Sequence, residues 1–364
     1  MFKKLSVLVK PSSGRCNLEC RYCFYKKEIL NRQNKNNELM SYENLEILVN
    51  KAIKATDEEG TIDFNFQGGE PMLRGLDFYE KFIAYVNSIK KNRKINYTLQ
   101  TNGSFVDDNW AKFFKKNRFL IGISLDGYEQ NHNYYRKNPK NNSYSEVINA
   151  IKLFEAYKVD YNILTVLTGL LSRNADKLYE FYKKNNIKYV QIISCINPIK
   201  KDRDVLDARG FERFWNDFFK LWYEDYKKGD ILNVDFFEQL IPMFKNIKPT
   251  KCGMLGNCSL QFVIESNLDV YPCDFFAVDE YKMGNLKYDE FFDMAKNTVS
   301  KNFINSKKNL AIACKNCKVY NLCRGNCKIQ NQVFFNKGKY LCAYRNFILE
   351  NYNKLTQIAS NIKV

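Results

Sequence analysis

Strand-like and helical patterns alternate six times over residues 1–195, and this alternation limits the folds that the chain can adopt. Runs rich in β-branched and aromatic residues, typical of strands, occupy residues 5–10, 61–66, 95–100, 119–125, 159–167 and 187–194. Helical patterns lie between them at 41–56, 78–91, 107–117, 143–158 and 175–185, the first with Ser41 as its expected N-cap. We predict an α/β fold, a partial (β/α)6 TIM-like barrel whose active end is formed by the C-terminal ends of the strands.

The pattern changes after residue 195. Residues 209–228 are predicted to form one long aromatic-rich helix, and the GDILNV segment that follows is the expected domain boundary. Beyond it apolar runs are short, and eight of the twelve cysteines fall between residues 252 and 342. A region so rich in ligands is expected to fold around metal centres. We therefore predict two domains, residues 1–234 and residues 235–364.

The N-terminal segment briefly resembles a signal peptide, but its apolar run LSVLV is too short, and no run of about 18 apolar residues is present for a membrane helix. We therefore expect a cytoplasmic protein, in which twelve cysteines favour metal ligation over disulfides. The net charge of +17 is compatible with nucleic-acid binding. Because the lysines are dispersed and no RNA-binding aromatic signature accompanies them, we favour a generally basic surface that could attract an acidic redox partner or substrate.

Three cysteines follow the first predicted strand with the spacing C-x3-C-x2-C: Cys16, Cys20 and Cys23. Three thiolates on one loop can hold three irons of a [4Fe-4S] cluster and leave the fourth iron open for a chelating substrate or cofactor. A zinc site or unrelated thiols are the alternatives. Structural zinc usually takes four protein ligands, and the single histidine, His132, is distant in sequence and is expected to be structural or surface-facing. The spacing therefore predicts an open cluster.

The C-terminal cysteines form a second group that is large enough for two further clusters. Eight thiols are available, at Cys252, Cys258, Cys273, Cys314, Cys317, Cys323, Cys327 and Cys342. Zinc is again the alternative, because C-x2-C pairs also occur in zinc sites. Because the same chain is predicted to hold an open iron–sulfur cluster, we favour iron–sulfur clusters over zinc for these eight thiols. The chain would then hold three [4Fe-4S] clusters in all. Cys195 is left over and is expected to be a buried apolar thiol.

The first cysteine motif, with Tyr22 before its last cysteine, resembles that of the radical S-adenosylmethionine superfamily. FQGGEP (66–71) matches the GGEP element of that family, and ISLDG (123–127) and NYYRK follow in order. The resemblance implies that S-adenosylmethionine chelates the open iron and yields a 5′-deoxyadenosyl radical, while the protein orients it and excludes water. It also implies a set of cofactor-binding residues: Tyr22, Gly69, Glu70, Ser124, Arg136 and Ile196. Among them, a guanidinium such as that of Arg136 suits the cofactor carboxylate.

The cysteine-rich region resembles the SPASM extension of peptide-modifying members of that superfamily. In this extension the ligands interleave, which implies one cluster on Cys252, Cys258, Cys273 and Cys327 and another on Cys314, Cys317, Cys323 and Cys342. CRYCFYKK, FNFQGGEP, LQTNG, SLDG, LWYED, CGMLGNC and VYPCDFF run in this order and together resemble the anaerobic sulfatase-maturating enzymes. That family oxidises a cysteine or serine in a C/S-x-P-x-R segment of a sulfatase to Cα-formylglycine.

The resemblance also implies a general base beside the substrate. Asp274 matches the base proposed for the family by its position in VYPCDFF, and a base must lie within about 3 Å of the proton that it removes. The alternative role for Asp274 is an ordinary helix N-cap. An auxiliary cluster is implied to take the second electron, and a flavodoxin or ferredoxin to be the electron donor. The implied partner is an unfolded or nascent sulfatase segment, with neither nucleic acid nor a membrane.

Three rival functions are open from the sequence. A maturase that crosslinks ribosomal peptides commonly carries an extra leader-binding domain, whereas only fifteen residues precede Cys16 and twenty-two follow Cys342. A non-catalytic electron carrier gains nothing from an unligated iron. An RNA-modifying radical enzyme would bring a separate RNA-binding domain, and the sequence shows none. We therefore expect formylglycine formation, with peptide crosslinking as the main alternative.

Overall fold

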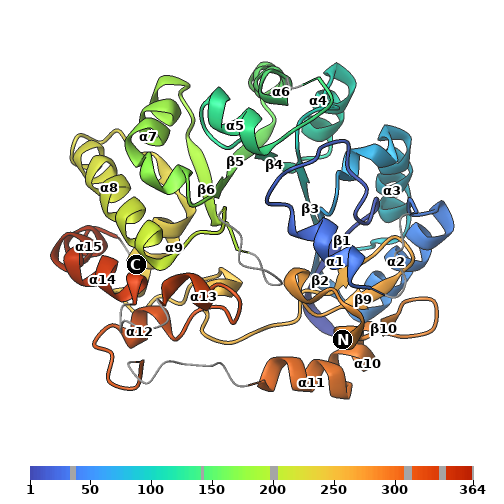
Figure 1. The fold of residues 1–364 in the computed structure, drawn as a ribbon. Helices are drawn as coiled ribbons and strands as arrows, with labels where there is room; N and C mark the ends of the chain where they lie inside the picture. Colours follow the sequence, from blue (N-terminus) through green and yellow to red (C-terminus); the bar gives the residue numbers. More distant parts are fainter. Residues whose placement is uncertain (33–37, 141–142, 197–203, 307–313, 336–341, 363–364) are drawn as a thin grey trace. The chain divides into compact units, whose positions relative to one another are not determined.

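The computed structural model describes residues 1–32, 38–140, 143–196, 204–306, 314–335 and 342–362 (Figure 1). The chain divides into two compact units. The first comprises Met1–Ser124, Asn133–Asn162 and Leu260–Asn305, and the second comprises Leu125–His132, Ile163–Ser259 and Ser306–Val364. Each unit therefore combines segments that are far apart in the sequence.

The first unit contains a sheet with the strand order β10-β9-β8-β1-β2-β3-β4. Its parallel part consists of β1 (Phe2–Val9), β2 (Thr56–Phe66), β3 (Lys94–Thr101) and β4 (Leu120–Ser124). The cysteine-rich part of the chain adds β8 (Val263–Ile264), which pairs with β1 in parallel, and then antiparallel β9 (Asp269–Tyr271) and β10 (Gly284–Asn285). The orange β9 and β10 accordingly lie near the blue β1 (Figure 1).

Amphipathic helices pack their apolar faces against the sheet of the first unit. They are α2 (Tyr42–Ala55), α3 (Leu76–Ile89), α4 (Asp108–Lys116) and α6 (Ser143–Tyr157). Of the other helices, α1 (Phe24–Leu30) follows β1 and α5 (Glu129–Tyr135) follows β4. Helices α10 (Phe291–Lys296) and α11 (Thr298–Asn305) follow β10. Ser41 Oγ accepts a hydrogen bond from Asn44 N at 3.1 Å, so Ser41 caps α2 as predicted. Phe64 and Phe66 of β2 and Phe82 of α3 are fully buried where sheet and helices meet.

The second unit is built on β5 (Asp160–Leu167), β6 (Tyr189–Ser194) and β7 (Asn233–Val234), with β6 parallel to both neighbours. Its main helices are α7 (Ala175–Lys184), α8 (Ala208–Lys227), α9 (Asp235–Met243), α14 (Ala343–Glu350) and α15 (Tyr352–Ser360). Aromatic side chains fill the space between α8, α9 and α14. Trp215 and Phe237, for example, are buried with their ring centres 5.4 Å apart.

The predicted order of elements is confirmed, and the strand orders are linear, without closure among the described strands. Two predicted strands begin later than the observed ones, because the starts of β1 and β2, at Phe2 and Thr56, carry lysines and acids that break the apolar pattern. The GDILNV segment, expected to be a boundary, contains β7, and the division at residue 234 stays a prediction. Over the described ranges, no helix is long and apolar enough to cross a membrane.

Candidate functional site

The first cysteine loop leads from the C-terminal end of β1 into α1. Cys16, Cys20 and Cys23 are half-buried on this loop and form no disulfide. Cys23 N donates to Cys20 O at 3.1 Å, and Leu18 N lies 3.3 Å from Cys16 Sγ. The three thiols thus lie together at a strand end, where the predicted cluster requires them, and their ligation of iron stays a prediction.

A side-chain amide at the end of β3 lies beside Cys16. Asn102, directly after β3, lies with Nδ2 3.7 Å from Cys16 Sγ and donates to Asn17 Oδ1 at 2.8 Å. Burial raises the pKa of the Cys16 thiol to about 12, and the nearby Glu70 adds to the rise. A thiol with such a high pKa stays protonated at neutral pH unless a nearby positive charge stabilises the thiolate. A bound metal ion provides that charge. The sequence analysis missed Asn102, although the motif LQTNG contains it.

The GGEP turn after β2 packs on the backbone of the first cysteine loop. Gly69 N donates to Ser13 O and Glu70 N donates to Arg15 O, both at 2.8 Å. A Cβ atom on Gly69 would lie 2.0 Å from the Arg15 carbonyl oxygen, and Gly68 has a φ of +128°. Neither position can hold a side chain without strain. The two glycines therefore allow the turn and the cysteine loop to approach each other closely.

The Glu70 carboxylate is buried and joins the ends of β2 and β3. Its Oε1 accepts from Met72 N at 3.1 Å and from Thr101 Oγ1 at 2.9 Å, and its Oε2 accepts from Asn102 N at 2.8 Å. Burial raises the pKa of Glu70 to about 7, although these donors and Arg136 oppose the rise. Because the Glu70 side chain and the N–H groups of Gly69 and Glu70 are already hydrogen-bonded, the predicted contact of this turn with a cofactor would use its backbone carbonyl groups.

The other predicted cofactor residues belong to both units. Tyr22, Ser124 and Arg136 are in the first unit, and Ile196, buried just after β6, is in the second. The guanidinium carbon of Arg136 lies 5.5 Å from the centre of the Tyr22 ring, and Arg136 is close enough to Glu70 to influence its pKa. The structure thus brings Arg136, Tyr22 and Glu70 near the first cysteine loop. Contacts of the whole set with a cofactor stay predictions.

Asp274 begins the short 3-10 helix η4 (Asp274–Phe276) and is buried. Its carboxylate does not cap that helix. Instead, Tyr25 Oη and Gln67 Nε2 both donate to Oδ2, the latter at 2.8 Å, and Lys10 Nζ lies 2.9 Å from Oδ1. Gln67 Nε2 also donates to Tyr25 Oη at 2.7 Å. The N-cap role considered for Asp274 is therefore wrong, and its carboxylate is held by two hydrogen-bond donors and one ion pair.

A buried charge network continues from Lys10. Lys10 is 1% exposed, and its Nζ lies 3.4 Å from Glu265 Oε1, which also lies 2.9 Å from Arg32 Nη1. Burial lowers the pKa of Lys10, but Asp274 and Glu265 outweigh it, and the pKa is raised on balance. Burial raises the pKa of Glu265, but Lys10 and Arg32 outweigh it, and that pKa is lowered. Two cations thus face two carboxyl groups inside the first unit.

Glu28 of α1 adds a third carboxyl group to this network. Its side chain is buried, and among the described residues neither carboxyl oxygen has a hydrogen-bond partner. Burial raises the pKa of Glu28 to about 8, since the effect of Lys10 in the opposite direction is smaller and Asp274 adds to the rise. Glu28 therefore holds a proton at neutral pH. The sequence analysis missed this residue and Lys10, because their long-range contacts leave no local pattern.

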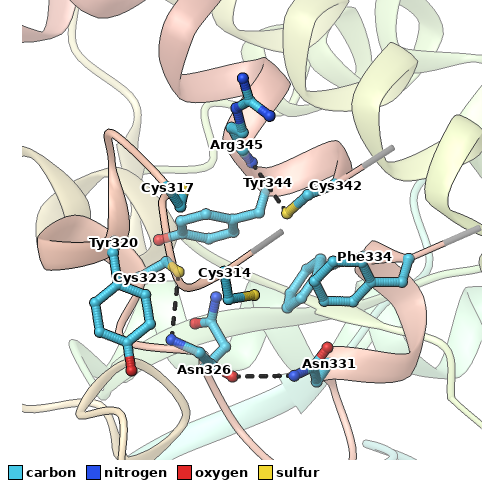
Figure 2. Close-up of a pocket in the computed structure, with 12 residues that line it drawn as sticks. Cys314, Cys317, Tyr320, Cys323, Asn326, Asn331, Phe334, Cys342, Tyr344 and Arg345 are labelled. Atoms are coloured by element: carbon cyan, nitrogen blue, oxygen red, sulfur yellow. Dashed lines mark hydrogen bonds between the residues drawn. The ribbon is translucent and has the colours of Figure 1, made fainter. Parts of the chain in front are cut away.

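Four of the C-terminal cysteines line one pocket of the second unit: Cys314, Cys317, Cys323 and Cys342. Figure 2 shows the sulfurs of Cys314, Cys323 and Cys342 around a common space, beside the rings of Tyr344 and Phe334. Cys323 ends α12 (Tyr320–Cys323), and Cys342 precedes α14. Gly325 N lies 3.3 Å from Cys323 Sγ, and Arg345 N lies 3.4 Å from Cys342 Sγ. These four cysteines are the set that the resemblance assigns to one auxiliary cluster.

The other predicted ligand set is brought together only in part. Cys252, Cys258 and Cys327 belong to the second unit. Gly253, the residue after Cys252, lies beside Cys327, because a Cβ atom on Gly253 would lie 3.8 Å from Cys327 Cβ. Cys273 belongs to the first unit, and its ligation of the same cluster stays a prediction.

The thiols around the pocket can be compared with the needs of a single ion and of a cluster. Over the ranges that the structure describes, no three His, Cys, Asp or Glu side chains are placed to hold one metal ion. Zinc needs its ligands about 2.0–2.3 Å from one point. In a [4Fe-4S] cluster each thiolate binds a different iron, so the sulfurs surround a space instead. Four reduced cysteines around one pocket therefore fit the predicted iron–sulfur cluster.

Cys195 and His132, for which no catalytic or ligand role was predicted, are both buried. Cys195 is buried directly after β6, where its backbone N donates to Leu167 O at 2.9 Å. His132 is buried, and its Nδ1 accepts from Asp126 N at 3.2 Å, which fixes the turn after β4.

Comparison with known proteins supports both halves of the predicted architecture. Residues 11–184 match the Radical SAM superfamily, and residues 230–318 match SPASM, an iron–sulfur cluster-binding domain. A cysteine-type anaerobic sulfatase-maturating enzyme from Clostridium novyi (strain NT) is 40% identical, over 99% of this chain and 98% of that protein. A serine-type anaerobic sulfatase-maturating enzyme from Bacteroides thetaiotaomicron is 29% identical, over 89% of this chain and 83% of that protein.

A solved structure is similar over nearly the whole chain. Native anSMEcpe with bound AdoMet and Cp18Cys peptide matches with a TM-score of 0.91 at 35% identity, over 99% of this chain and 100% of that one. Together with the family matches, this confirms the predicted fold class, an α/β partial barrel with a SPASM domain.

Proposed function

This chain belongs to the anaerobic sulfatase-maturating enzymes of the radical SAM superfamily, and we propose that Asp274 is the general base of its reaction. The enzyme is an oxidoreductase that converts a cysteine or serine in a C/S-x-P-x-R segment of a sulfatase to Cα-formylglycine. The net change is a two-electron oxidation, so the site must provide both a proton acceptor and an electron acceptor. Peptide crosslinking, the main rival, is disfavoured because the sulfatase-maturating relatives match along the full chain.

Three [4Fe-4S] clusters and S-adenosylmethionine serve this chemistry. We assign the open cluster to Cys16, Cys20 and Cys23, and the auxiliary clusters to the two interleaved sets, Cys252, Cys258, Cys273 and Cys327, and Cys314, Cys317, Cys323 and Cys342. When bound at the open cluster, S-adenosylmethionine supplies the 5′-deoxyadenosyl radical that takes a hydrogen atom from the substrate Cβ. The residues proposed to hold it are Tyr22, Gly69, Glu70, Ser124, Arg136 and Ile196, with the Arg136 guanidinium donating to its carboxylate.

The setting of the Asp274 carboxylate is the observation that carries the base assignment. Tyr25 and Gln67 donate to one of its oxygens, and Lys10 lies 2.9 Å from the other. A carboxylate fixed in this way needs little reorganisation when it receives the substrate proton. Cys273, the preceding residue, is a proposed cluster ligand, so the proton acceptor adjoins an electron acceptor. These contacts support Asp274 as the group that removes the thiol proton while the Cβ hydrogen is lost.

We further propose a cysteine as the target and a flavodoxin or ferredoxin as the electron donor. The identity is higher to the cysteine-type relative, 40% over 99% of this chain, than to the serine-type one, 29% over 89%. The proposed setting is the cytoplasm, where the twelve thiols would stay reduced.

The replacement Asp274→Asn tests the base assignment, because it keeps the size of the side chain and cannot take the proton. We expect the variant, with its clusters intact, to cleave S-adenosylmethionine while formylglycine forms about 100-fold more slowly on a C-x-P-x-R peptide. Mass spectrometry of the peptide and chromatography of 5′-deoxyadenosine measure the two products. The exposed Asp293→Asn is the matched control.

Three other outcomes would contradict parts of the proposal. Full formylglycine yield in Asp274→Asn would exclude Asp274 as the base. An unaltered peptide with the wild-type enzyme, despite turnover of S-adenosylmethionine, would exclude the function. Faster conversion of the matching S-x-P-x-R peptide would exclude the preference for cysteine.

A further inference from the structure

Basic side chains surround the first cysteine loop on the surface of the first unit. In the segments 15–26 and 134–140 the exposed charged residues are Arg15, Glu19, Arg21, Lys26, Lys137 and Lys140, and only one of these six is acidic. We name the five cations the basic rim. Because Cys16, Cys20 and Cys23 are themselves half-buried, this rim lies at the edge of the proposed open cluster.

Backbone contacts hold the two segments of the basic rim together. Glu19 N donates to Lys137 O at 2.7 Å, and Arg21 N donates to Tyr135 O at 2.9 Å. The segment after α5 therefore runs along the cysteine loop itself. Lys137 is in this way fixed beside a loop that is distant in sequence, so the rim is a product of the fold and not of one basic run.

The cations of the basic rim are largely available to a partner. Lys26 Nζ lies 3.3 Å from Glu19 Oε1 in an exposed pair, which contributes little in water. The Arg21 guanidinium carbon lies 4.1 Å from the centre of the Tyr134 ring, which orients the side chain without neutralising it. Arg15 and Lys137 form no ion pair with any described residue. The local excess of positive charge therefore stays uncompensated.

We propose that the basic rim is the docking surface for an acidic electron-carrier protein that reduces the open cluster. This inference rests on the proposed function, which requires one electron at that cluster in each turnover. The donor is oxidised by one electron and the cluster is reduced by one electron, and no atom or proton is transferred. Electron transfer weakens steeply with distance, so a donor must approach the side of the molecule where the cluster is least covered. A rim of cations attracts an acidic protein to that side and orients it.

Charge reversal within the basic rim provides the test. The double variant Lys26→Glu/Lys137→Glu is compared with Lys115→Glu/Lys116→Glu, which reverses two exposed charges on α4 and leaves the net charge equal. Holoenzyme is mixed with reduced flavodoxin, and the absorbance of the clusters gives the reduction rate. Calorimetry gives the affinity of the two proteins. Titanium(III) citrate, a small reductant, serves as the second electron source.

The rim variant is expected to be reduced by flavodoxin at least about tenfold more slowly than wild type at low salt, with weaker binding. The difference should shrink at high ionic strength, where charges are screened. Reduction by titanium(III) citrate should stay unchanged, and the α4 variant should behave as wild type with both reductants.

Each remaining outcome overturns the proposal in a distinct way. Equal slowing of the α4 variant would assign the effect to net charge, and equal slowing with titanium(III) citrate would assign it to the cluster itself. A rim variant that reduces normally but loses affinity for a short RNA would make the rim a nucleic-acid surface. A wild-type enzyme that forms no formylglycine even with titanium(III) citrate would refute the proposed function independently of the rim.

Discussion

The buried carboxyl group of Glu28 leads to a stability difference that depends on pH. Burial raises its pKa from 4.5 to about 8, so between these values the folded chain holds a proton that the unfolded chain has lost. Stability must then fall as the pH rises through this window, by about 1.4 kcal/mol per pH unit. Below pH 4.5 both states are protonated and no cost arises.

The replacement Glu28→Gln removes the titrating group and keeps the shape of the side chain. The variant should gain stability relative to wild type as the pH rises, by about 3 kcal/mol between pH 5.5 and 7.5. Urea denaturation of anaerobically prepared protein with equal cluster content, at both pH values, gives the two differences in free energy of unfolding. Because clusters and other groups titrate alike in both proteins, their contributions cancel in the comparison.

The matched control is Glu46→Gln, an exposed glutamate on α2, for which the stability difference should be nearly the same at both pH values. A stability difference for Glu28→Gln that does not change between pH 5.5 and 7.5 would refute the reasoning. It would mean that Glu28 ionises in the folded protein as readily as in the unfolded chain, and that the network around Lys10 carries one more negative charge than we infer.

Three further predictions concern the site. Gly69→Ala should give little folded protein with an intact first cluster, because the new Cβ would lie 2.0 Å from the Arg15 carbonyl oxygen; normal iron content and S-adenosylmethionine affinity would contradict this. Tyr25→Phe removes one donor to Asp274 and should slow formylglycine formation by about 10-fold to 100-fold while cofactor cleavage persists, as quenched-flow product analysis would show. Iron analysis should find about twelve irons per chain after anaerobic reconstitution and about eight when Cys323 and Cys342 are both alanine, whereas about four in wild type would exclude the auxiliary clusters.

Local sequence patterns were sufficient to predict the longer helices and strands. The runs that became β3 to β6 are rich in β-branched and aromatic side chains, and Ser41 caps α2 because a hydroxyl before an apolar helix has few other roles. Strands β7 and β8 are two residues each, too short for any periodicity to be visible. The helix α9 was also missed, because Pro242 lies inside it and usually argues against a helix.

Some residues of the candidate site could likewise be identified from the sequence, and others could not. The resemblance to the SPASM extension assigned Cys314, Cys317, Cys323 and Cys342 to one cluster, and all four line one pocket. The surroundings of Asp274 were not predictable, because Lys10, Tyr25 and Gln67 reach it from β1, α1 and the end of β2. In the sequence Lys10 is only the residue that ends an apolar run. Its contact with a carboxylate at position 274 depends on β8 pairing with β1, which no local pattern reveals.

The pairing of β8 with β1 also helps to explain how Asp274 contacts residues that are distant in the sequence. Val263 of β8 pairs with both Leu8 of β1 and Tyr271 of β9, so β8 joins the strand that precedes Asp274 to the strand that precedes Lys10. Cys273 is extended, with φ −159° and ψ 148°, and Asp274 then begins a 3-10 turn. Successive side chains of an extended segment point to opposite sides. The Asp274 carboxylate contacts Lys10, Tyr25 and Gln67, and the proposed role of Cys273 as a cluster ligand requires its thiol to lie on the other side. We predict that a one-residue insertion between β9 and Cys273 would reverse these two sides, so that the proposed base and the proposed ligand could not both be in place.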